Sequence, residues 1–354
     1  MTAIALPTER QRVIKSRAGE GGLALERQPV AAPGAGEVLV QVRQAAICGT
    51  DLHLYQWNDW AARNYRPPLP LGHEFAGVVL AVGEGVHHIR PGCHVAGETH
   101  LSCGHCRQCR ANRRHTCENL RLFSKLGVGC FADYLTVPEQ VLRPLHPELP
   151  FAKAAVMEPF GVGVRAAMEA DLRGKNLLMS GCGPIGLYTI AAARHLGAAS
   201  IVAIDPSPFR RALAMKIGAT VALEPSAGAL RDSVHEALRG DGVEVAIDAS
   251  GRAGAVEQAL DCVAAGGSVV LVGVPERPLQ IDAGRHLINR ELRLQGTYGR
   301  LIDETWLVAE RLMLSGQVDV EPILTHTLPL EGYQEAFALA LGGAAGKVAF
   351  ELPA

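Results

Sequence analysis

Strand and helix patterns alternate through the second half of the chain, and this alternation constrains the fold more than any other feature. Apolar runs of strand length, bounded by turn residues, are separated by stretches with helical periodicity. Strands joined by helices of about 10–15 residues are typical of parallel sheets. The sequence therefore predicts an α/β domain with a doubly wound parallel sheet. Its predicted strands are residues 176–180, 200–205, 243–248 and 267–273, and its predicted helices are residues 184–196, 208–217 and 253–263.

The first part of the chain has a different pattern. Between about residues 20 and 150, short strands such as 37–43 and 75–82 alternate with turn residues, which predicts a β-rich, partly open barrel. The 354 residues exceed the roughly 250–300 at which single cores stop growing, so we expect two domains. A strand-like run at 347–352 favours a return of the tail to the β-rich domain. The predicted domains are residues 1–157 with 299–354, and residues 158–298.

Four cysteines lie close together with the spacing C-x2-C-x2-C-x7-C. Thiolates at this density suit a structural Zn²⁺, which takes four ligands at roughly 2.3 Å and keeps no open position. Two alternatives remain: disulfide bonds, which the short loops disfavour, and an iron–sulfur cluster. The sequence predicts a structural zinc lobe over about residues 98–120, with the ligands Cys103, Cys106, Cys109 and Cys117.

A glycine motif, G-x-G-x-x-G, follows the first predicted strand of the α/β domain and begins the next predicted helix. In this context the glycines let the backbone approach a pyrophosphate and let the helix pack closely on the strand. The alternative is a glycine turn that binds nothing. Asp205 ends the following strand, where a carboxylate accepts ribose hydroxyls and repels a 2′-phosphate. The alternative is NADP, because Arg210 and Arg211 lie nearby and could hold a 2′-phosphate. We predict an NAD site that includes Gly181, Gly183, Pro184, Ile185, Gly186 and Asp205.

Three further segments carry the ligand types of an open zinc site, namely Cys48, His73 with Glu74, and Glu158. A zinc ion with an open position polarises an alcohol and lowers its pKa. Thr50, two residues after Cys48, offers a hydroxyl that relays the alcohol proton. Taken singly, each residue has a plainer interpretation, since a lone buried cysteine usually packs in the core and His73 could be a hydrogen-bonded core histidine.

Net charge and cysteine content limit the binding partners and the cellular compartment that we expect. The formal net charge is −2, so no overall field favours nucleic acid or an anionic membrane. Nine cysteines, five of them scattered outside the cluster, favour a reducing compartment. No stretch approaches the ~20 apolar residues of a membrane span, and the N-terminus lacks an apolar run of signal-peptide length. We expect a soluble, cytoplasmic protein.

Along almost the whole chain, these motifs resemble the zinc-containing medium-chain dehydrogenases. The cysteine lobe, Gly-His-Glu at 72–74 and the glycine motif are general to that family. Trp-Asn-Asp-Trp at 57–60, Glu-Thr-His at 98–100, Gly-Arg at 299–300 and Glu-Thr-Trp at 304–306 are narrower and favour its L-threonine 3-dehydrogenase branch. The resemblance implies a GroES-like catalytic domain, a Rossmann NAD domain, two Zn²⁺ per chain and a homotetramer.

The resemblance also implies roles for individual residues. Cys48, His73, Glu74 and Glu158 resemble the ligands of the catalytic zinc, with Glu74 or Glu158 exchanging with water or substrate. The implied reaction is hydride transfer from L-threonine to NAD, giving 2-amino-3-oxobutanoate. The alternatives are the same chemistry on a polyol, sugar acid or amino-sugar alcohol, and a non-catalytic dinucleotide sensor that lost the catalytic metal. The residues matching catalytic positions are Thr50, His100 and Glu158, and those matching ribose-binding positions are Asp205 and Arg210.

The chain departs from the family pattern close to the predicted active site. After Glu158-Pro-Phe-Gly the family usually continues Asn-Ala-Val, whereas Val162 stands here in place of the amide. This change removes a contact to a polar substrate. Arg300 and Arg165 are candidates for the substrate carboxylate, with an ordinary ion pair as the alternative for Arg300. Trp57 and Trp60 are candidates for a pocket lid or a subunit contact.

Overall fold

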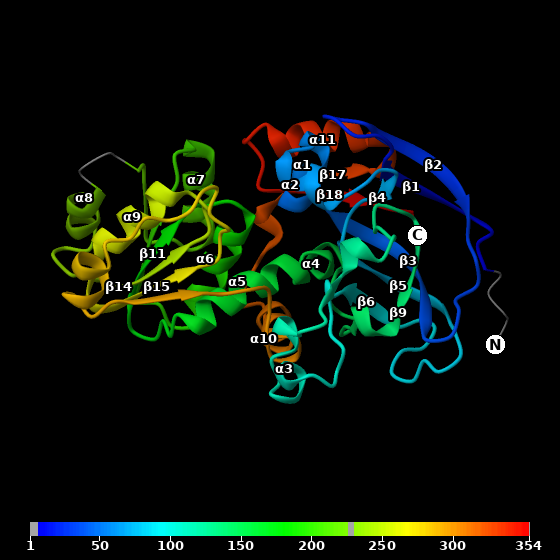
Figure 1. Cartoon of the computed structure of the whole chain (residues 1–354), viewed down its shortest axis with the longest axis horizontal. Coiled ribbons are helices and arrows are strands. Elements are labelled where there is room, and N and C mark those ends of the chain that lie inside the picture. The colour runs from blue at the N-terminus through cyan, green and yellow to red at the C-terminus, as the bar shows by residue number, and fades with distance from the viewer. Residues whose placement is uncertain (1–5, 226–229, 354) are drawn as a thin grey trace. The chain divides into compact units, whose positions relative to one another are not determined.

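The computed structural model describes residues 6–225 and 230–353 and divides the chain into two compact units (Figure 1). The first unit comprises Met1–Glu158 with Leu324–Ala354, and the second comprises Pro159–Ile323. Residues 1–5 and 354, which the sequence assigns to the first domain, lie outside the described residues. Within the described parts, no helix combines the length and apolarity that crossing a membrane requires.

The first unit is built on a seven-stranded sheet, in which β9 pairs with β3 beside the path β10-β6-β5-β3-β18-β17. Most of β3 is buried, and its alternate residues Val38, Val40 and Val42 belong to the hydrophobic core of this unit. The strands are β3 (Glu37–Ala46), β5 (Glu74–Val82), β6 (His94–Gly97), β9 (Tyr134–Pro138), β10 (Leu142–Pro144), β17 (Leu324–Pro329) and β18 (Lys347–Glu351).

Smaller elements complete the first unit. A three-stranded sheet of order β2-β1-β4 consists of β1 (Glu9–Lys15), β2 (Leu23–Pro29) and β4 (Leu69–Pro70). The pair β7 (His100–Leu101) and β8 (Arg121–Leu122) lies at the base of the cysteine lobe. The helices are α1 (Gly49–Gln56), α2 (Asp59–Asn64), α3 (Arg107–Arg110), α4 (Phe151–Ala155) and α11 (Tyr333–Leu341).

The second unit confirms the predicted doubly wound sheet. Its six strands are all parallel, in the order β13-β12-β11-β14-β15-β16. The strands after β11 are added first on one side of it (β12, β13) and then on the other (β14, β15, β16). Ligands bind at such a switch point in the strand order. The strands are β11 (Asn176–Ser180), β12 (Ser200–Ile204), β13 (Val221–Leu223), β14 (Val243–Asp248), β15 (Val263–Leu271) and β16 (Arg293–Gly296).

Helices α6, α7 and α9 pack on this sheet (Figure 1). The segment 299–323, which the sequence assigns to the first domain, groups instead with the second unit. The reason is that its last turn, Glu321–Ile323, packs on α6 and α7, and Trp306 and Ala309 are buried. The helices are α5 (Met157–Glu169), α6 (Pro184–His195), α7 (Pro208–Ile217), α8 (Leu230–Ala237), α9 (Ala253–Cys262) and α10 (Ile302–Leu314).

Candidate active site and metal centres

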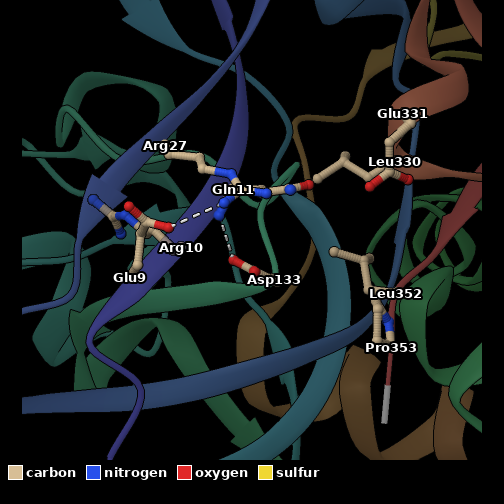
Figure 2. Close-up of a pocket in the computed structure, with 9 residues that line it drawn as sticks. All are labelled: Glu9, Arg10, Gln11, Arg27, Asp133, Leu330, Glu331, Leu352 and Pro353. Atoms are coloured by element: carbon tan, nitrogen blue, oxygen red, sulfur yellow. Dashed lines mark hydrogen bonds and ion pairs between the residues drawn. The ribbon is translucent and has the colours of Figure 1, made fainter.

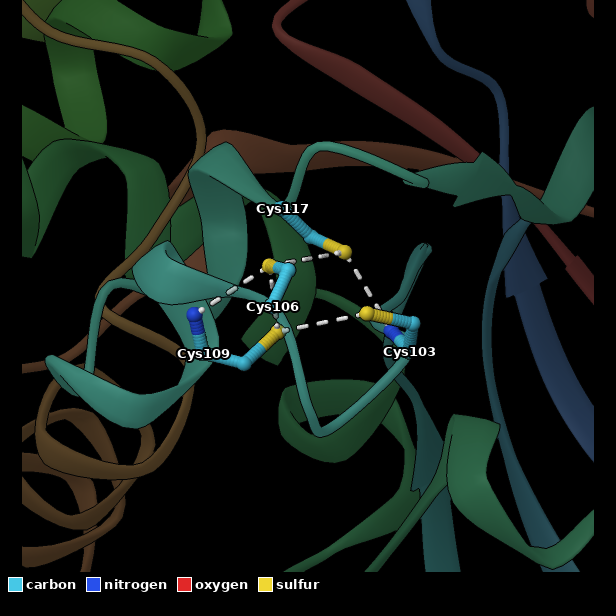
Figure 3. A group of neighbouring side chains, drawn as sticks. All are labelled: Cys103, Cys106, Cys109 and Cys117. Atoms are coloured by element: carbon cyan, nitrogen blue, oxygen red, sulfur yellow. Dashed lines mark hydrogen bonds between the residues drawn. The ribbon is translucent and has the colours of Figure 1, made fainter.

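The four clustered cysteines converge within the lobe that follows β7 (Figure 3). The Cys106 Sγ atom lies 3.4 Å from that of Cys109 and 3.9 Å from that of Cys117, and the Sγ atoms of Cys103 and Cys109 lie 4.0 Å apart. Backbone N–H groups point at the sulfurs: those of Cys103 and Asn119 donate to Cys117 Sγ at 3.2 and 3.3 Å. Such donors stabilise thiolates.

These distances discriminate among the three interpretations of the cluster. All nine cysteines are free, and no sulfur pair approaches the roughly 2.05 Å of a disulfide. Four sulfurs bound tetrahedrally to one zinc ion at roughly 2.3 Å would lie about 3.8 Å apart, which leaves no room for a multi-iron cluster. Burial raises the pKa of Cys109 to about 11, whereas backbone hydrogen bonds lower the pKa of Cys103 to about 6, and a cation between the sulfurs would stabilise all four as thiolates. The donor set therefore fits one zinc ion.

A second group of ligand types forms where β3, α1 and β5 meet. One ligand atom each from Cys48, His73 and Glu74 lies within 4.8 Å of the others. Cys48 caps the N-terminus of α1, and Glu74 is the first residue of β5. The Thr50 hydroxyl lies 3.9 Å from Cys48 Sγ. The structure thus brings together three of the four predicted ligands and the predicted relay hydroxyl.

Asp51 and Gly72 hold the two ligand-bearing segments together. The buried Asp51 carboxylate accepts the N–H of Cys48 at 3.0 Å and that of Gly72 at 3.1 Å. Gly72 has φ of +85°, and a Cβ there would lie 2.4 Å from the Phe131 ring, so only glycine fits. The sequence analysis did not assign Asp51, although its position three residues after an N-terminal cap is a recognisable signal.

Lys347 is a second residue of this group that no sequence motif marks. This residue begins β18 and is buried, with its Nζ 2.7 and 2.6 Å from the two carboxylate oxygens of Glu74. Its Nζ also donates to the Ile47 carbonyl at 2.9 Å. Burial lowers the pKa of Lys347, but Glu74, Cys48 and Glu158 together offset this and raise it, so the ammonium stays charged. No local pattern signals this partnership.

The electrostatics of this second group favour a bound cation. Burial lowers the pKa of His73, but the Cys48 thiol and the carboxylates of Asp51 and Glu158 raise it more, to about 10. An imidazole that retains a proton to this extent lies in an anionic field. A divalent cation would satisfy the same field, because a neutral imidazole, a thiolate and a carboxylate are the donors that zinc takes. The donor set therefore fits an open zinc site.

Glu158 and His100 belong to a buried hydrogen-bond network beside this group. The Glu158 carboxylate lies outside the 4.8 Å group and accepts a hydrogen bond from Thr99 Oγ1 at 3.0 Å. His100 Nδ1 lies 3.0 Å from Glu98 Oε1, which also accepts the His100 N–H at 2.9 Å. Glu98 is fully buried and fixes the orientation of the imidazole. Glu98 and Thr99 are part of the Glu-Thr-His motif at 98–100, for which the sequence predicted a role only for His100.

The glycine motif of the second unit has the geometry of a phosphate-binding turn. Gly181 has φ of +87°, and a Cβ there would lie 2.8 Å from Ser250. A Cβ at Gly186 would lie 1.9 Å from the Gly181 carbonyl oxygen, so helix and strand are in direct contact. A Cβ at Gly183 meets nothing within 4 Å. The open space at Gly183, where Pro184 and Ile185 begin α6, is where a pyrophosphate would rest on the helix N-terminus.

Asp205 connects this turn to the next βα loop. Its buried carboxylate accepts the N–H of Cys182 and that of Ser207, both at 2.8 Å, and keeps lone pairs for further donors. Arg211 donates to the backbone oxygens of Asp205 and Pro206 and pairs with Glu224. Arg210 differs, because its buried Nε has no hydrogen-bond partner among the described residues. Arg210 therefore remains available to a ligand at this edge.

The candidates for the substrate carboxylate differ in environment. Arg165 forms an ion pair with Glu169 at 2.7 Å within α5. Arg300 is only 1% exposed and packs against Gly161. The Trp57 ring lies 5.3 Å from Lys15 Nζ, which indicates a packing role within the first unit. Trp60 is partly exposed, and its ring lies 5.3 Å from that of Tyr65.

A surface pocket of the first unit lies apart from these groups (Figure 2). Its charges are mixed and partly paired, since Arg27 contacts Glu9 at 3.4 Å and the Gln11 N–H donates to Asp133 at 2.9 Å. None of the predicted site residues lines it, so we assign it no part in the chemistry. The lining residues are Glu9, Arg10, Gln11, Arg27, Asp133, Leu330, Glu331, Leu352 and Pro353.

Two family models match the chain. Residues 34–147 match the alcohol dehydrogenase GroES-like domain, and residues 184–315 match the zinc-binding dehydrogenase domain. The first range contains Cys48, His73, Glu74 and the cysteine lobe, and the second begins at the N-terminus of α6. The matches therefore cover both units.

Curated relatives match over almost the entire chain. The L-threonine 3-dehydrogenase of Coxiella burnetii is 38% identical over 330 residues, which cover 92% of this chain and 95% of that protein. The L-threonine 3-dehydrogenase of Pyrococcus horikoshii is 39% identical over 341 residues, covering 96% and 98%.

Solved structures show the same architecture with lower identity. An Escherichia coli CFT073 alcohol dehydrogenase in complex with NADH has a TM-score of 0.88 and 25% identity, covering 98% of this chain and 100% of that one. L-idonate 5-dehydrogenase of Escherichia coli K-12 has a TM-score of 0.85 and 28% identity, covering 97% and 98%.

Proposed function

This chain belongs to the zinc-binding alcohol dehydrogenase family with a GroES-like domain, and we propose that it oxidises the secondary alcohol of L-threonine with NAD. The family makes it a zinc- and nicotinamide-nucleotide-dependent oxidoreductase of a small-molecule alcohol. The proposal adds the substrate, the preference for NAD over NADP, two zinc ions per chain and the residues that bind them. The overall reaction converts L-threonine and NAD into 2-amino-3-oxobutanoate, NADH and a proton.

The observation that carries the proposal is the convergence of Cys48, His73 and Glu74 within 4.8 Å. These residues would hold the catalytic zinc ion together with Glu158, with Glu74 or Glu158 exchanging with water or substrate, and the four lobe cysteines would hold a structural ion. When bound, zinc supplies a Lewis acid that lowers the alcohol pKa, and the nicotinamide supplies a hydride acceptor. The closed cysteine lobe contributes stability and no chemistry.

Residues around the ligand group would orient the substrate and move its proton. The Thr50 hydroxyl, 3.9 Å from Cys48 Sγ, accepts the alcohol proton and passes it outward. His100, whose Nδ1 lies 3.0 Å from Glu98 Oε1, matches a position beside the substrate in the L-threonine 3-dehydrogenase branch, and we assign it a substrate contact. Glu158, held by Thr99, offers negative charge to the substrate ammonium. These groups support an amino-alcohol substrate.

The cofactor preference rests on Asp205. Its carboxylate, next to the open space at Gly183, would accept the adenosine ribose hydroxyls and repel a 2′-phosphate. Gly181, Gly183 and Gly186 would admit the pyrophosphate, with Pro184 and Ile185 in the first turn of α6. The buried, unpartnered Nε of Arg210 supports a second contact to the ribose.

A polyol or sugar acid is the second candidate substrate. The L-idonate 5-dehydrogenase likeness favours it, as does Val162, because this position offers no hydrogen bond to an amino acid. A non-catalytic dinucleotide sensor is disfavoured, since the three converging ligand types would have no purpose in it.

We further propose a cytoplasmic homotetramer. The nine unpaired cysteines support a reducing compartment, and the resemblance to the L-threonine 3-dehydrogenases supports the assembly. Light scattering coupled to size-exclusion chromatography measures the mass directly, and we expect four copies of the 37.5 kDa chain.

NADH production across L-threonine, D-threonine, sorbitol and aldonic acids tests the substrate. We expect the highest kcat/KM for L-threonine. A polyol or sugar acid that reacts at least a hundredfold better than L-threonine would refute the substrate and leave the reaction class standing. Metal analysis on the same sample tests the sensor alternative, because a sensor would hold one zinc ion per chain.

A further inference from the structure

Glu74 faces two positively charged groups at once. One is the Lys347 ammonium, which lies within 2.7 Å of both carboxylate oxygens. The other is the metal ion for which Cys48 and His73 are the neighbouring ligands, because the ligand atoms of all three residues lie within 4.8 Å of one another. A carboxylate has lone pairs for both, but each cation withdraws electron density that the other would use.

Burial, a backbone hydrogen bond and strand pairing hold the Lys347 side chain beside Glu74. It is 3% exposed, and its Nζ donates to the carbonyl of Ile47, the residue before Cys48. Its strand β18 pairs with β3, whose C-terminal end leads directly to Cys48. The ammonium is therefore positioned by the same backbone that positions the first ligand.

We propose that Lys347 is a positioning residue that competes with the catalytic metal for the Glu74 carboxylate. Lys347 makes Glu74 a weak, exchangeable ligand and so leaves a coordination position for the substrate oxygen. The inference rests on the metal role proposed above for Cys48 and His73. It also goes beyond that role, because it assigns the exchange of Glu74 to a specific residue far away in the sequence.

A purely structural role for Lys347 makes a different prediction. Buried ion pairs often contribute little net stability, whereas removing one partner leaves an uncompensated charge and destabilises the fold. On that view, loss of Lys347 loosens the site, and zinc escapes faster. Competition predicts the opposite, since a Glu74 carboxylate without its ammonium binds zinc more strongly.

The test is the rate at which a chelator removes the catalytic zinc from the full-length enzyme. We expect Lys347→Met to release this zinc at least tenfold more slowly than the unchanged enzyme, with kcat lower by at least tenfold. Release at an equal or faster rate would overturn the proposal. Lys15→Met is the matched control, because Lys15 is equally buried but donates only to the carbonyls of Gly19, Gly21 and Tyr55.

A Glu74→Gln background keeps the test decisive if Lys347→Met alone does not fold. The double variant Glu74→Gln/Lys347→Met removes both charges and should fold. Because Lys347 acts through Glu74, the double variant should release zinc within threefold of the rate of Glu74→Gln alone. A larger difference would contradict competition. If the unchanged enzyme holds zinc only in the cysteine lobe, the proposed function fails as well, and metal content reveals this before any variant is made.

Discussion

The two glycines at the start of α6 offer a sharp prediction because the structure gives them opposite surroundings. Gly183 has φ of −66°, a value any residue adopts, and an added methyl group meets nothing within 4 Å. At Gly186 an added methyl group would lie 1.9 Å from the Gly181 carbonyl oxygen. Gly183→Ala should therefore fold normally and bind NAD poorly, whereas Gly186→Ala should lose stability.

The magnitudes follow from these distances. For Gly186→Ala, α6 must move by roughly 1 Å, and forcing an extra methyl into a packed contact costs about 1–3 kcal/mol. At about 2–4 °C per kcal/mol for a domain of this size, the melting temperature should fall by roughly 2–12 °C. Gly183→Ala should leave it unchanged or slightly higher, because alanine reduces the entropy of the unfolded chain by about 0.4–1 kcal/mol.

Calorimetry of unfolding and titration with NAD measure both quantities. The new methyl group of Gly183→Ala occupies the space assigned to the pyrophosphate, so the Kd for NAD should rise at least tenfold, or about 1.4 kcal/mol. If Gly183→Ala binds NAD like the unchanged enzyme, the pyrophosphate does not rest on this turn. If Gly186→Ala unfolds at an unchanged temperature, the close contact between α6 and the turn that follows β11 is not real.

Three further predictions concern the structural zinc, the cofactor and the substrate. Cys103→Ser should lower the melting temperature and the zinc content of the lobe, because structural zinc contributes folding free energy directly; unchanged stability in thermal unfolding would refute a structural role. Asp205→Ser together with a nearby basic substitution should raise kcat/KM for NADP relative to NAD. If the unsubstituted enzyme already uses NADP as well as NAD, the role of Asp205 is refuted. If L-threonine is the substrate, His100→Ala should reduce its turnover by at least tenfold, and Val162→Asn should be neutral or mildly favourable. Equal losses on every alcohol tested would argue against a substrate contact for His100.

Local patterns predicted the second unit well. Strands and helices there depend on periodicity and on glycine turns, which act over a few residues, and β11, β14 and α7 begin and end as expected. The end of α9 differs by one residue, and β15 starts at Val263 instead of at the predicted residue 267. The grouping of 299–323 was also missed, since the packing of Glu321–Ile323 on α6 and α7 joins segments far apart in the sequence.

Only those site residues that belong to short sequence motifs could be predicted. Cys48, His73 and Glu74 belong to short recognisable segments, and the structure brings them together. Lys347 could not be predicted in this way, because its partner Glu74 lies 273 residues away and the two meet through the pairing of both β18 and β5 with β3.

Metal content and activity of Cys48→Ser test the central claim most directly. The account predicts that the unchanged enzyme contains two zinc ions per chain and reduces NAD with L-threonine. Cys48→Ser should keep its fold and the zinc ion of the cysteine lobe, lose the other ion and lose turnover by at least a thousandfold. A Cys48→Ser variant that retains two zinc ions, or that remains active with one, would contradict the account.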